Sequence, residues 1–325
     1  MCTGVRLIAH DGSVAYGRTL EFAQELQSNI LVIPRNYTIA GIGTDTKKSG
    51  LSWQARYAAV GANACNEIAL VDGINEHGLA GGLFYFPGYA HFQETQDLSN
   101  AIAPWQLLTW ILTQCTSIEH VQQQLPTITV INIPFPAWGI VPPVHAIVHD
   151  ITGKSLVIEY QHGTLFMHDN PLGVLTNAPD FQWHMTNVRN YLNLSAYNVA
   201  PQKIGNIELR PFGQGSGMVG LPGDFTPPSR FIRAALFTNT VITPKDANDA
   251  VHTVFHILDL FNIPGGIIRE KENNTVLCDY TQWTSACDLK NRRYYYHTYN
   301  NRSPIMIDLT QTDIDTKEPS LMKMK

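Results

Sequence analysis

The chain has 325 residues, enough to bury a sizeable core in one large domain or in two small ones. Only 15% of the residues are charged and the formal net charge is -5, so no basic face is expected to bind nucleic acid or an anionic membrane. No apolar run has the length of a transmembrane helix, and no linker divides the chain, so we expect a single domain over residues 1–325.

The chain start and the cysteines bear on the compartment. No basic segment followed by an apolar run opens the sequence, so there is no sign of a signal peptide and the cytoplasm is the expected location. The five cysteines, at 2, 65, 115, 278 and 287, are odd in number and lack the spacing of zinc ligands. We therefore expect no disulfide framework, no metal and no organic cofactor.

The first residues combine two chemical groups that can act together. If Met1 is removed, Cys2 carries a thiol nucleophile and a free α-amine, and such an amine titrates near pH 8 and can serve as the base. Strand-forming residues at 4–9 and 13–20 flank an Asp-Gly turn, which predicts a β-hairpin. The hairpin would return Arg18 and Glu21 to Cys2, where Arg18 favours the thiolate and Glu21 holds the ammonium. The alternative is a solvated ion pair on a surface strand.

From residue 29 onward, groups of strands alternate with pairs of helices. The predicted strands are 29–34, 57–61, a hairpin over 68–86, a meander of 145–149, 155–160 and 164–168, a strand over 173–180 that ends on Asn177, and then 276–279, 293–299 and 304–309. The predicted helices are 103–113, 118–125, 229–237 and 244–261. This order predicts an α+β fold in which two stacked antiparallel sheets carry helices on both outer faces.

Three remaining stretches have no regular pattern. Residues 129–143 are apolar and rich in proline, which suggests either a loop that lines a pocket or a packed surface loop. The polar segment 187–211 is expected to leave the core, and 312–325 forms a polar tail that is either frayed or docked on a subunit.

Gly215-Ser-Gly-Met-Val-Gly220 formally matches a dinucleotide-binding fingerprint. No strand leads into it, and Pro222-Gly223 prevents the helix whose N-terminus would hold the phosphate. We therefore do not expect a nucleotide site.

Several motifs together resemble one known family. They are Met1-Cys-Thr3, Gly17-Arg-Thr-Leu-Glu-Phe22, Asp72-Gly-Ile-Asn-Glu-His-Gly-Leu79, Phe86-Pro-Gly-Tyr-Ala90, Thr176-Asn-Ala-Pro179, Phe212-Gly-Gln-Gly215 and Gly220-Leu-Pro-Gly-Asp-Phe-Thr-Pro-Pro-Ser-Arg-Phe231. In combination they look like the choloylglycine hydrolase family, which groups conjugated bile acid hydrolases with penicillin V acylases. The resemblance spans nearly the whole chain.

The resemblance implies an N-terminal nucleophile hydrolase, an αββα sandwich that opens the C–N bond of a linear amide without a metal or an organic cofactor. By position, Cys2 matches the nucleophile, Arg18 the arginine beside the thiol, Asn177 the oxyanion-hole asparagine and Arg230 a second active-site arginine. The thiolate would form a thioester that water then cleaves.

Two positions depart from a uniform family pattern. Glu21 stands where the family usually has Asp, and the extra methylene moves its carboxylate by roughly one bond length at a site that tolerates about half an ångström. Tyr85 stands where the bile-salt branch commonly has Asn and the penicillin V branch has Tyr, so it is expected to contact the substrate and to support the oxyanion. The alternative for Tyr85 is a structural tyrosine within a strand.

Three functional interpretations stay open at this point. The first is a penicillin V type acylase that cleaves aromatic or aliphatic acyl amides, the second is a conjugated bile acid hydrolase that releases glycine or taurine, and the third is a small-molecule carrier in which Cys2 is incidental. Acyl-homoserine lactones are equally compatible with the chemistry. The resemblance also implies a homotetramer, with a dimer as the fallback, assembled through residues 187–211.

Overall fold

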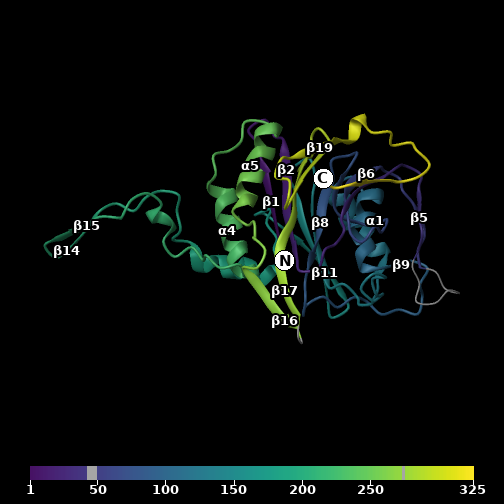
Figure 1. The fold of residues 1–325 in the computed structure, drawn as a ribbon, viewed down its shortest axis with the longest axis horizontal. Helices are drawn as coiled ribbons and strands as arrows, with labels where there is room; N and C mark the ends of the chain where they lie inside the picture. Colours follow the sequence, from purple (N-terminus) through teal and green to yellow (C-terminus); the bar gives the residue numbers. More distant parts are fainter. Residues whose placement is uncertain (42–49, 273–274) are drawn as a thin grey trace.

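The computed structural model describes residues 1–41, 50–272 and 275–325. Two large antiparallel sheets stack against each other, and helices cover both outer faces (Figure 1). The predicted α+β sandwich is therefore confirmed.

The N-terminal sheet begins with the predicted hairpin. Its strands, in the order of pairing, are β1 (Cys2–Ile8), β2 (Val14–Phe22), β17 (Thr275–Asp288), β18 (Arg293–Thr298) and β19 (Ile305–Asp308), while β16 (Ile268–Glu272) pairs with β17. The turn forms because Gly12 adopts a φ of +79° and the Asp11 carboxylate accepts a hydrogen bond from the Ser13 N–H at 2.8 Å. Cys2 consequently lies opposite Leu20, one residue from Glu21.

The large sheet contains the predicted hairpin and the predicted meander. Its order is β13 (Thr164–Asp169), β12 (Ser155–Gln161), β11 (Val144–His149), β8 (Ala80–Tyr85), β7 (Leu70–Asn75), β6 (Ala59–Asn63), β3 (Asn29–Ile33) and β20 (Ser320–Lys323). Part of the C-terminal tail is thus an edge strand rather than a frayed end. An edge strand pairs on one side only and can be largely polar. The tail therefore lacks the apolar pattern from which a strand is predicted.

Four of the helices lie near their predicted limits, whereas the helix over 181–187 was not predicted. The helices are α1 (Leu107–Gln114) after η1 (Pro104–Gln106), α2 (Ile118–Gln124) before η2 (Leu125–Thr127), α3 (Phe181–Asn187) before η3 (Val188–Tyr191), α4 (Pro227–Thr240) and α5 (Ala247–Asp259). The Ser117 side chain caps α2 by accepting from the His120 N–H, and two prolines open α4. α4 and α5 cover the N-terminal sheet, whereas α1 packs on β7 and β8 of the large sheet.

One predicted strand is wrong. Residues 173–180 contain a single bridge, between Gly4 and Leu175, and no strand. Gly173 has a φ of +64°, and the carbonyls of Thr176 and Asn177 accept hydrogen bonds from histidine side chains instead of from a neighbouring strand. The apolar run therefore indicated burial and not strand pairing.

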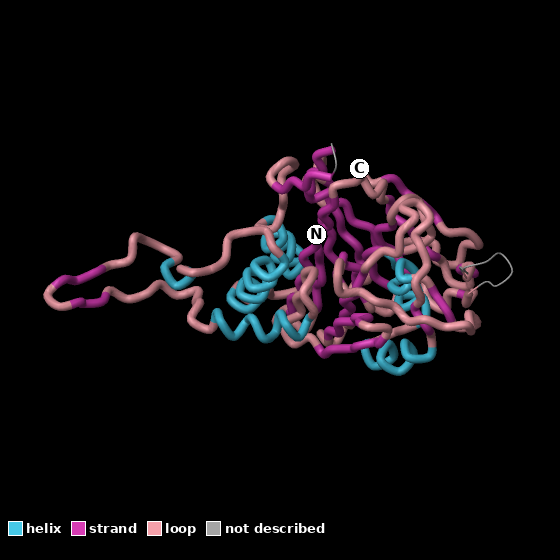
Figure 2. The backbone as a smooth tube through the Cα atoms, turned by 90° about the horizontal axis from the view of Figure 1, so that it is seen from below, coloured by secondary structure: helices cyan, strands magenta, loops and turns pink. Residues whose placement is uncertain are grey.

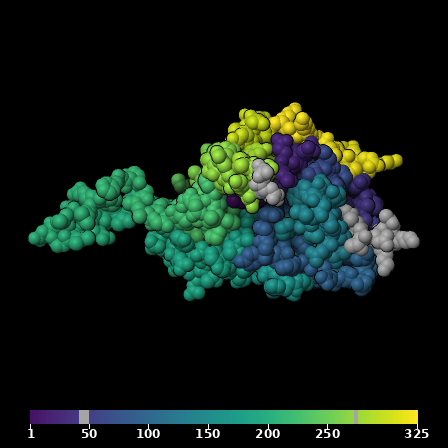
Figure 3. Space-filling view, turned by 60° about the horizontal axis from the view of Figure 1, so that its bottom comes forward, coloured from purple at the N-terminus to yellow at the C-terminus, as the bar shows by residue number. Residues whose placement is uncertain are grey.

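An exposed arm projects from the body of the molecule (Figures 1 and 2). We define the arm as residues 192–224; it includes the hairpin of β14 (Gln202–Ile204) and β15 (Ile207–Leu209) and the turn η4 (Ser216–Met218). Figure 3 shows how far it extends beyond the packed layers. The arm thus continues past residue 211, where the predicted segment ended.

Short paired segments and one turn complete the fold. They are β4 (Thr38–Ile39) with β5 (Trp53–Gln54), β9 (Ala101–Ile102) with β10 (Thr129–Val130), and η5 (Leu309–Gln311).

Candidate active site

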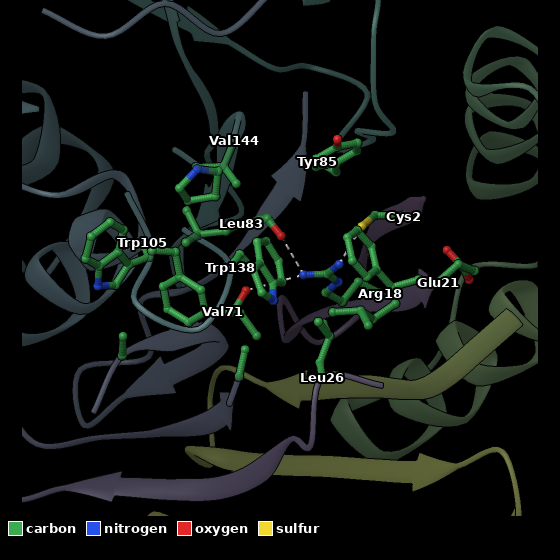
Figure 4. Close-up of a pocket in the computed structure, with 16 residues that line it drawn as sticks. Cys2, Arg18, Glu21, Leu26, Val71, Leu83, Tyr85, Trp105, Trp138 and Val144 are labelled. Carbon is green, nitrogen blue, oxygen red and sulfur yellow. Dashed lines mark hydrogen bonds between the residues drawn. The ribbon is translucent and has the colours of Figure 1, made fainter. Parts of the chain in front are cut away.

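Cys2 is buried at the start of β1, and a buried arginine holds its sulfur. Arg18 lies on the neighbouring strand β2, and its Nη2 donates to the Cys2 Sγ at 2.7 Å. The Arg18 Nη1 donates to the carbonyls of Leu83 at 2.7 Å and Val71 at 3.3 Å (Figure 4). These bonds fix the guanidinium, so a full positive charge faces the sulfur in a site with little screening.

Asp72 supports Arg18 from the large sheet. Its carboxylate accepts hydrogen bonds from the hydroxyls of Ser285 at 2.6 Å, Tyr294 at 2.9 Å and Tyr16 at 3.1 Å. Burial raises the pKa of Asp72, while Arg18 and the three hydroxyls act in the opposite direction. Burial alone would lower the pKa of Arg18, but the charges on the nearby Cys2, Tyr16, Asp72 and Glu21 raise it above its ordinary value.

Arg230 reaches Cys2 from the opposite face of the N-terminal sheet. It projects from α4, and its Nη1 donates to the Cys2 carbonyl and to the Thr3 hydroxyl, the latter at 2.9 Å. The Arg230 Nη2 donates to the Asn177 Oδ1 at 2.7 Å. Cys2 therefore lies between two buried arginines, one on each side of the sheet.

Asn177 contacts the backbone of Cys2 directly. Its Oδ1 accepts from the Cys2 N–H at 2.9 Å, and its Nδ2 donates to the carbonyl of Tyr85 at 2.7 Å. An amide NH2 group has two donors, so one N–H of Asn177 has no hydrogen-bond partner among the described residues.

Glu21 is buried beside the chain terminus. Its Oε1 accepts from the Thr281 hydroxyl at 3.0 Å, and its Oε2 has no hydrogen-bond partner among the described residues. Burial raises the pKa of Glu21, and the terminal ammonium and Arg230 oppose this effect. The backbone N–H of Glu21 donates to the Met1 carbonyl at 2.9 Å, so Met1 covers this part of the site.

An apolar cavity of about 80 Å³ opens at the Cys2 sulfur (Figure 4). Aromatic rings form much of its wall: Phe22 and Trp138 stack with centroids 5.4 Å apart, and Tyr85 meets Phe22 edge to face at 5.8 Å. The wall also contains Phe135, from the proline-rich loop that the sequence suggested as pocket-lining. We call this hollow the apolar cavity.

A second hollow adjoins the apolar cavity and shares Phe22, Tyr85 and Trp138 with it. Met1 lines it as well, and so does Asn177, which contacts the Cys2 backbone. We call this hollow the outer groove. Tyr85 thus borders both hollows, while its hydroxyl has no hydrogen bond in the part of the chain that the structure describes.

Two buried histidines that the sequence did not indicate hold the backbone around Asn177. The His145 Nε2 lies 3.2 Å from the Thr176 carbonyl, and the His184 Nε2 lies 2.9 Å from the Asn177 carbonyl. His184 also stacks on Phe231, the residue after Arg230, with centroids 4.6 Å apart. Burial lowers the pKa of His184 to about 4, so its ring is neutral and Nε2 carries the proton. No local motif marks these residues: His145 acts through a carbonyl 31 residues away, and His184 through one that is seven residues away and not on its own helix.

Within the described residues, no group of three or more His, Cys, Asp or Glu side chains could hold a metal ion. No helix in the described parts of the chain is long and apolar enough to cross a membrane.

The fold and the site together define a class. Stacked antiparallel sheets between helical layers, with a cysteine at the start of the first strand, are those of the N-terminal nucleophile hydrolases. The chain belongs to the linear amide C–N hydrolases of the choloylglycine hydrolase family, whose sequence profile matches residues 2–322.

Relatives in this family come from several bacteria. A bile salt hydrolase/transferase of Clostridium perfringens is 35% identical over 98% of this chain and 95% of its own length. The crystal structure of a variant conjugated bile acid hydrolase from Clostridium perfringens superposes with a TM-score of 0.89 at 33% identity, covering 100% of this chain and 97% of that one. A penicillin V acylase from Agrobacterium tumefaciens shares the fold, with a TM-score of 0.80 at 20% identity over 99% of this chain and 91% of that one.

Proposed function

We propose that this protein cleaves a linear amide with Cys2 as the nucleophile, after Met1 has been removed. The observation that carries the proposal is the 2.7 Å contact between the Arg18 guanidinium and the Cys2 sulfur at the mouth of the apolar cavity. A thiolate stabilised by a fixed cation beside an apolar hollow is suited to attack an acyl group that the hollow holds.

In the proposed mechanism, the sulfur attacks the amide carbonyl carbon and a C–S bond forms. The carbonyl electron pair moves to oxygen, where the free N–H of Asn177 donates to it. The Cys2 ammonium then gives a proton to the departing nitrogen as the C–N bond breaks. Water attacks the thioester, the Cys2 amine takes its proton, and the acid leaves. Arg230 fixes Asn177, and the unpartnered Oε2 of Glu21 holds the ammonium between the steps.

For the acyl half we favour a penicillin V type acylase that accepts an aromatic or aliphatic group. The aromatic wall of the apolar cavity and Tyr85 on its rim support this choice. Side-by-side kcat/KM values on penicillin V and glycocholate test it, and a large preference for glycocholate would reverse the order.

Conjugated bile acid hydrolysis is the second candidate. The 35% identity to a bile salt hydrolase/transferase favours it, whereas the penicillin V acylase matches at only 20%. Both candidates use the same Cys2 chemistry and differ in the substrate that the pocket receives.

A carrier without turnover predicts that Cys2→Ala leaves ligand behaviour unchanged, whereas our proposal predicts that all hydrolysis stops. Mass spectrometry of the active protein gives a separate test. Active enzyme that retains Met1 would contradict the role of the Cys2 amine.

We also infer that the protein self-associates through the arm. We expect a homotetramer, with a dimer as the alternative. Large apolar side chains on the arm are largely exposed, including Leu192 at 79% and Tyr197 at 85%, and such surface is usually covered by a partner. Size-exclusion chromatography at micromolar concentration tests the association, and a monomer would reject it.

We also propose the cytoplasm as the site of action, because all five cysteines are free.

A further inference from the structure

The backbone that carries Asn177 is not held by a sheet. Residues 176–180 belong to no strand of the described chain, and α3 begins at Phe181. The Asn177 side chain spans the Cys2 N–H and the Tyr85 carbonyl, so a shift of this backbone would move the Asn177 donor relative to the sulfur. Side chains from other elements therefore have to fix the segment.

Glu159, a fully buried residue on β12, contacts both ends of this segment. Its Oε1 accepts from the Phe181 N–H at 3.1 Å, at the start of α3. The same oxygen lies 3.1 Å from the His145 Nδ1, and the His145 Nε2 lies 3.2 Å from the Thr176 carbonyl. One carboxylate oxygen thus holds Phe181 directly and Thr176 through a histidine, and Asn177 lies between these two attachments.

The hydrogen-bond partners of His145 determine how it donates. A carboxylate and a backbone carbonyl accept hydrogen bonds and do not donate them. Because Nδ1 faces Glu159 and Nε2 faces Thr176, both ring nitrogens donate. The second carboxylate oxygen of Glu159 accepts from the Gln161 Nε2 at 2.9 Å, so both of its oxygens are satisfied. The buried charge is therefore paired and hydrogen-bonded, which is the condition under which a fold tolerates it.

Packing fixes the plane of the His145 ring. The ring stacks on Phe86, with centroids 4.1 Å apart and an angle of 3° between the planes. His145 and Glu159 lie on the neighbouring strands β11 and β12, where Ala146 pairs with Ile158, so the two side chains stand next to each other on one face of the sheet. The link from the carboxylate to the segment is therefore built on rigid elements.

Stabilisation of an oxyanion depends on a donor that is held in place before the reaction. On the basis of the proposed amide hydrolysis, in which Asn177 is that donor, we propose that Glu159 is a positioning residue for Asn177. It acts on turnover through the segment that it holds at both ends. Glu159 and His145 are absent from the described residues that line the apolar cavity and the outer groove, so substrate binding should change little when they are replaced.

The first test is Glu159→Gln, assayed with penicillin V and with glycocholate. We expect kcat to fall about tenfold with KM within about twofold, because the neutral amide weakens the hold on His145 and on the Phe181 N–H and lets the Asn177 donor shift. Glu159→Asp keeps the buried charge, and with it the fold, but withdraws the carboxylate by one methylene. It should lower kcat in the same way if Glu159→Gln does not fold.

A double-mutant cycle with Asn177→Ala separates positioning from a general loss of structure. In the Asn177→Ala background, Glu159→Gln and Glu159→Asp should each change kcat by less than about twofold, because their effect in the wild-type background depends on the Asn177 side chain. A purely structural role would lower kcat by the same factor in both backgrounds.

The matched control is Asp150→Asn. Asp150 is also a buried carboxylate, and its Oδ2 accepts from the N–H of Ile118, the first residue of α2, at 3.0 Å. Glu159 makes the same kind of contact with the first residue of α3. Asp150→Asn should lower the midpoint of chemical denaturation and leave kcat unchanged in both backgrounds.

Unchanged kcat in the folded Glu159 variants, or a loss that persists in full in the Asn177→Ala background, would overturn the positioning role while amide hydrolysis stands. If the wild-type protein hydrolyses neither amide and mass spectrometry detects no acylated Cys2, the proposed function itself fails, and the role of Glu159 in turnover fails with it. The two failures give different results in the same set of assays.

Discussion

The two faces of the large sheet use buried polar groups differently. The inner face, toward the N-terminal sheet, carries the charged residues Asp72 and Glu159, both fully buried. The outer face, toward α1, is an apolar layer in which Asn75 bonds only to backbone, donating to the carbonyls of Leu112 and Cys115 at 2.8 Å each. Buried charges destabilise a fold unless they are paired, so the buried carboxylates of the inner face mark it as the candidate functional face.

This comparison predicts that substitutions on the inner side change turnover, while those on the outer side change stability.

The largest effect is expected from Cys2→Ala, which should lower kcat by at least about 10⁴-fold because no nucleophile remains. The paired variant is Cys115→Ala, in the apolar layer against α1. It should keep kcat and lower the free energy of unfolding by about 1 kcal/mol through lost packing. Turnover assays and chemical denaturation check both. Equal kcat values for Cys2→Ala and Cys115→Ala would contradict the assignment of chemistry to the inner side of the large sheet.

Asn177→Ala should lower kcat by about 10²–10³-fold, because it removes the donor to the oxyanion. Asn75→Ala removes an equally buried amide from the outer face. We expect it to lower the free energy of unfolding by about 1–3 kcal/mol, since two carbonyls lose their partner, with little change in kcat. A kcat loss of similar size in Asn75→Ala would show that the faces do not differ in function.

Acid should weaken the fold through His184. Its folded pKa of about 4 lies below the unfolded value of 6.5, so the unfolded chain binds more protons between these values and stability falls as the pH is lowered through this window. His184 alone accounts for up to about 3 kcal/mol. Denaturation at pH 4.5, 5.5 and 6.5 should show a shallower slope for His184→Gln than for wild type. An unchanged slope would mean that this ring is not held neutral by burial.

The smallest effect on kcat is expected from a pair of variants at His184, which tests whether this residue positions Asn177 or only packs beside it. His184→Gln places an amide donor near the position of Nε2, whereas His184→Asn places it one bond too short to reach the Asn177 carbonyl. Both variants lose the stacking on Phe231, so they differ mainly in how far the amide reaches. We expect His184→Asn to have a kcat about tenfold below that of His184→Gln with similar KM. Identical kcat values would assign His184 a structural role only.

Much of the fold could be predicted from local pattern. The Asp-Gly turn predicted the first hairpin, and the regularly spaced turns between 145 and 168 predicted three strands, because these signals act within a few residues. The helix predicted to start at Ser229 begins two residues earlier, at Pro227. The strand predicted at 173–180 failed because burial alone does not specify a pairing partner. β20 was missed because its partner, β3, lies almost 300 residues away in the chain.

The sequence by itself determined which residues could do the chemistry: a cysteine after the initiator Met, an arginine and a carboxylate on the returning strand, and motifs that resemble one family. Only the tertiary structure decided how they meet. It brings Arg18 and Arg230 to Cys2 from opposite faces of one sheet. It also places the His184 ring against the Asn177 carbonyl, and Glu270 and Asp279 at the outer groove. The physical reason is that charge, donors and cavities act through space, and sheet pairing sets distances that sequence separation does not contain.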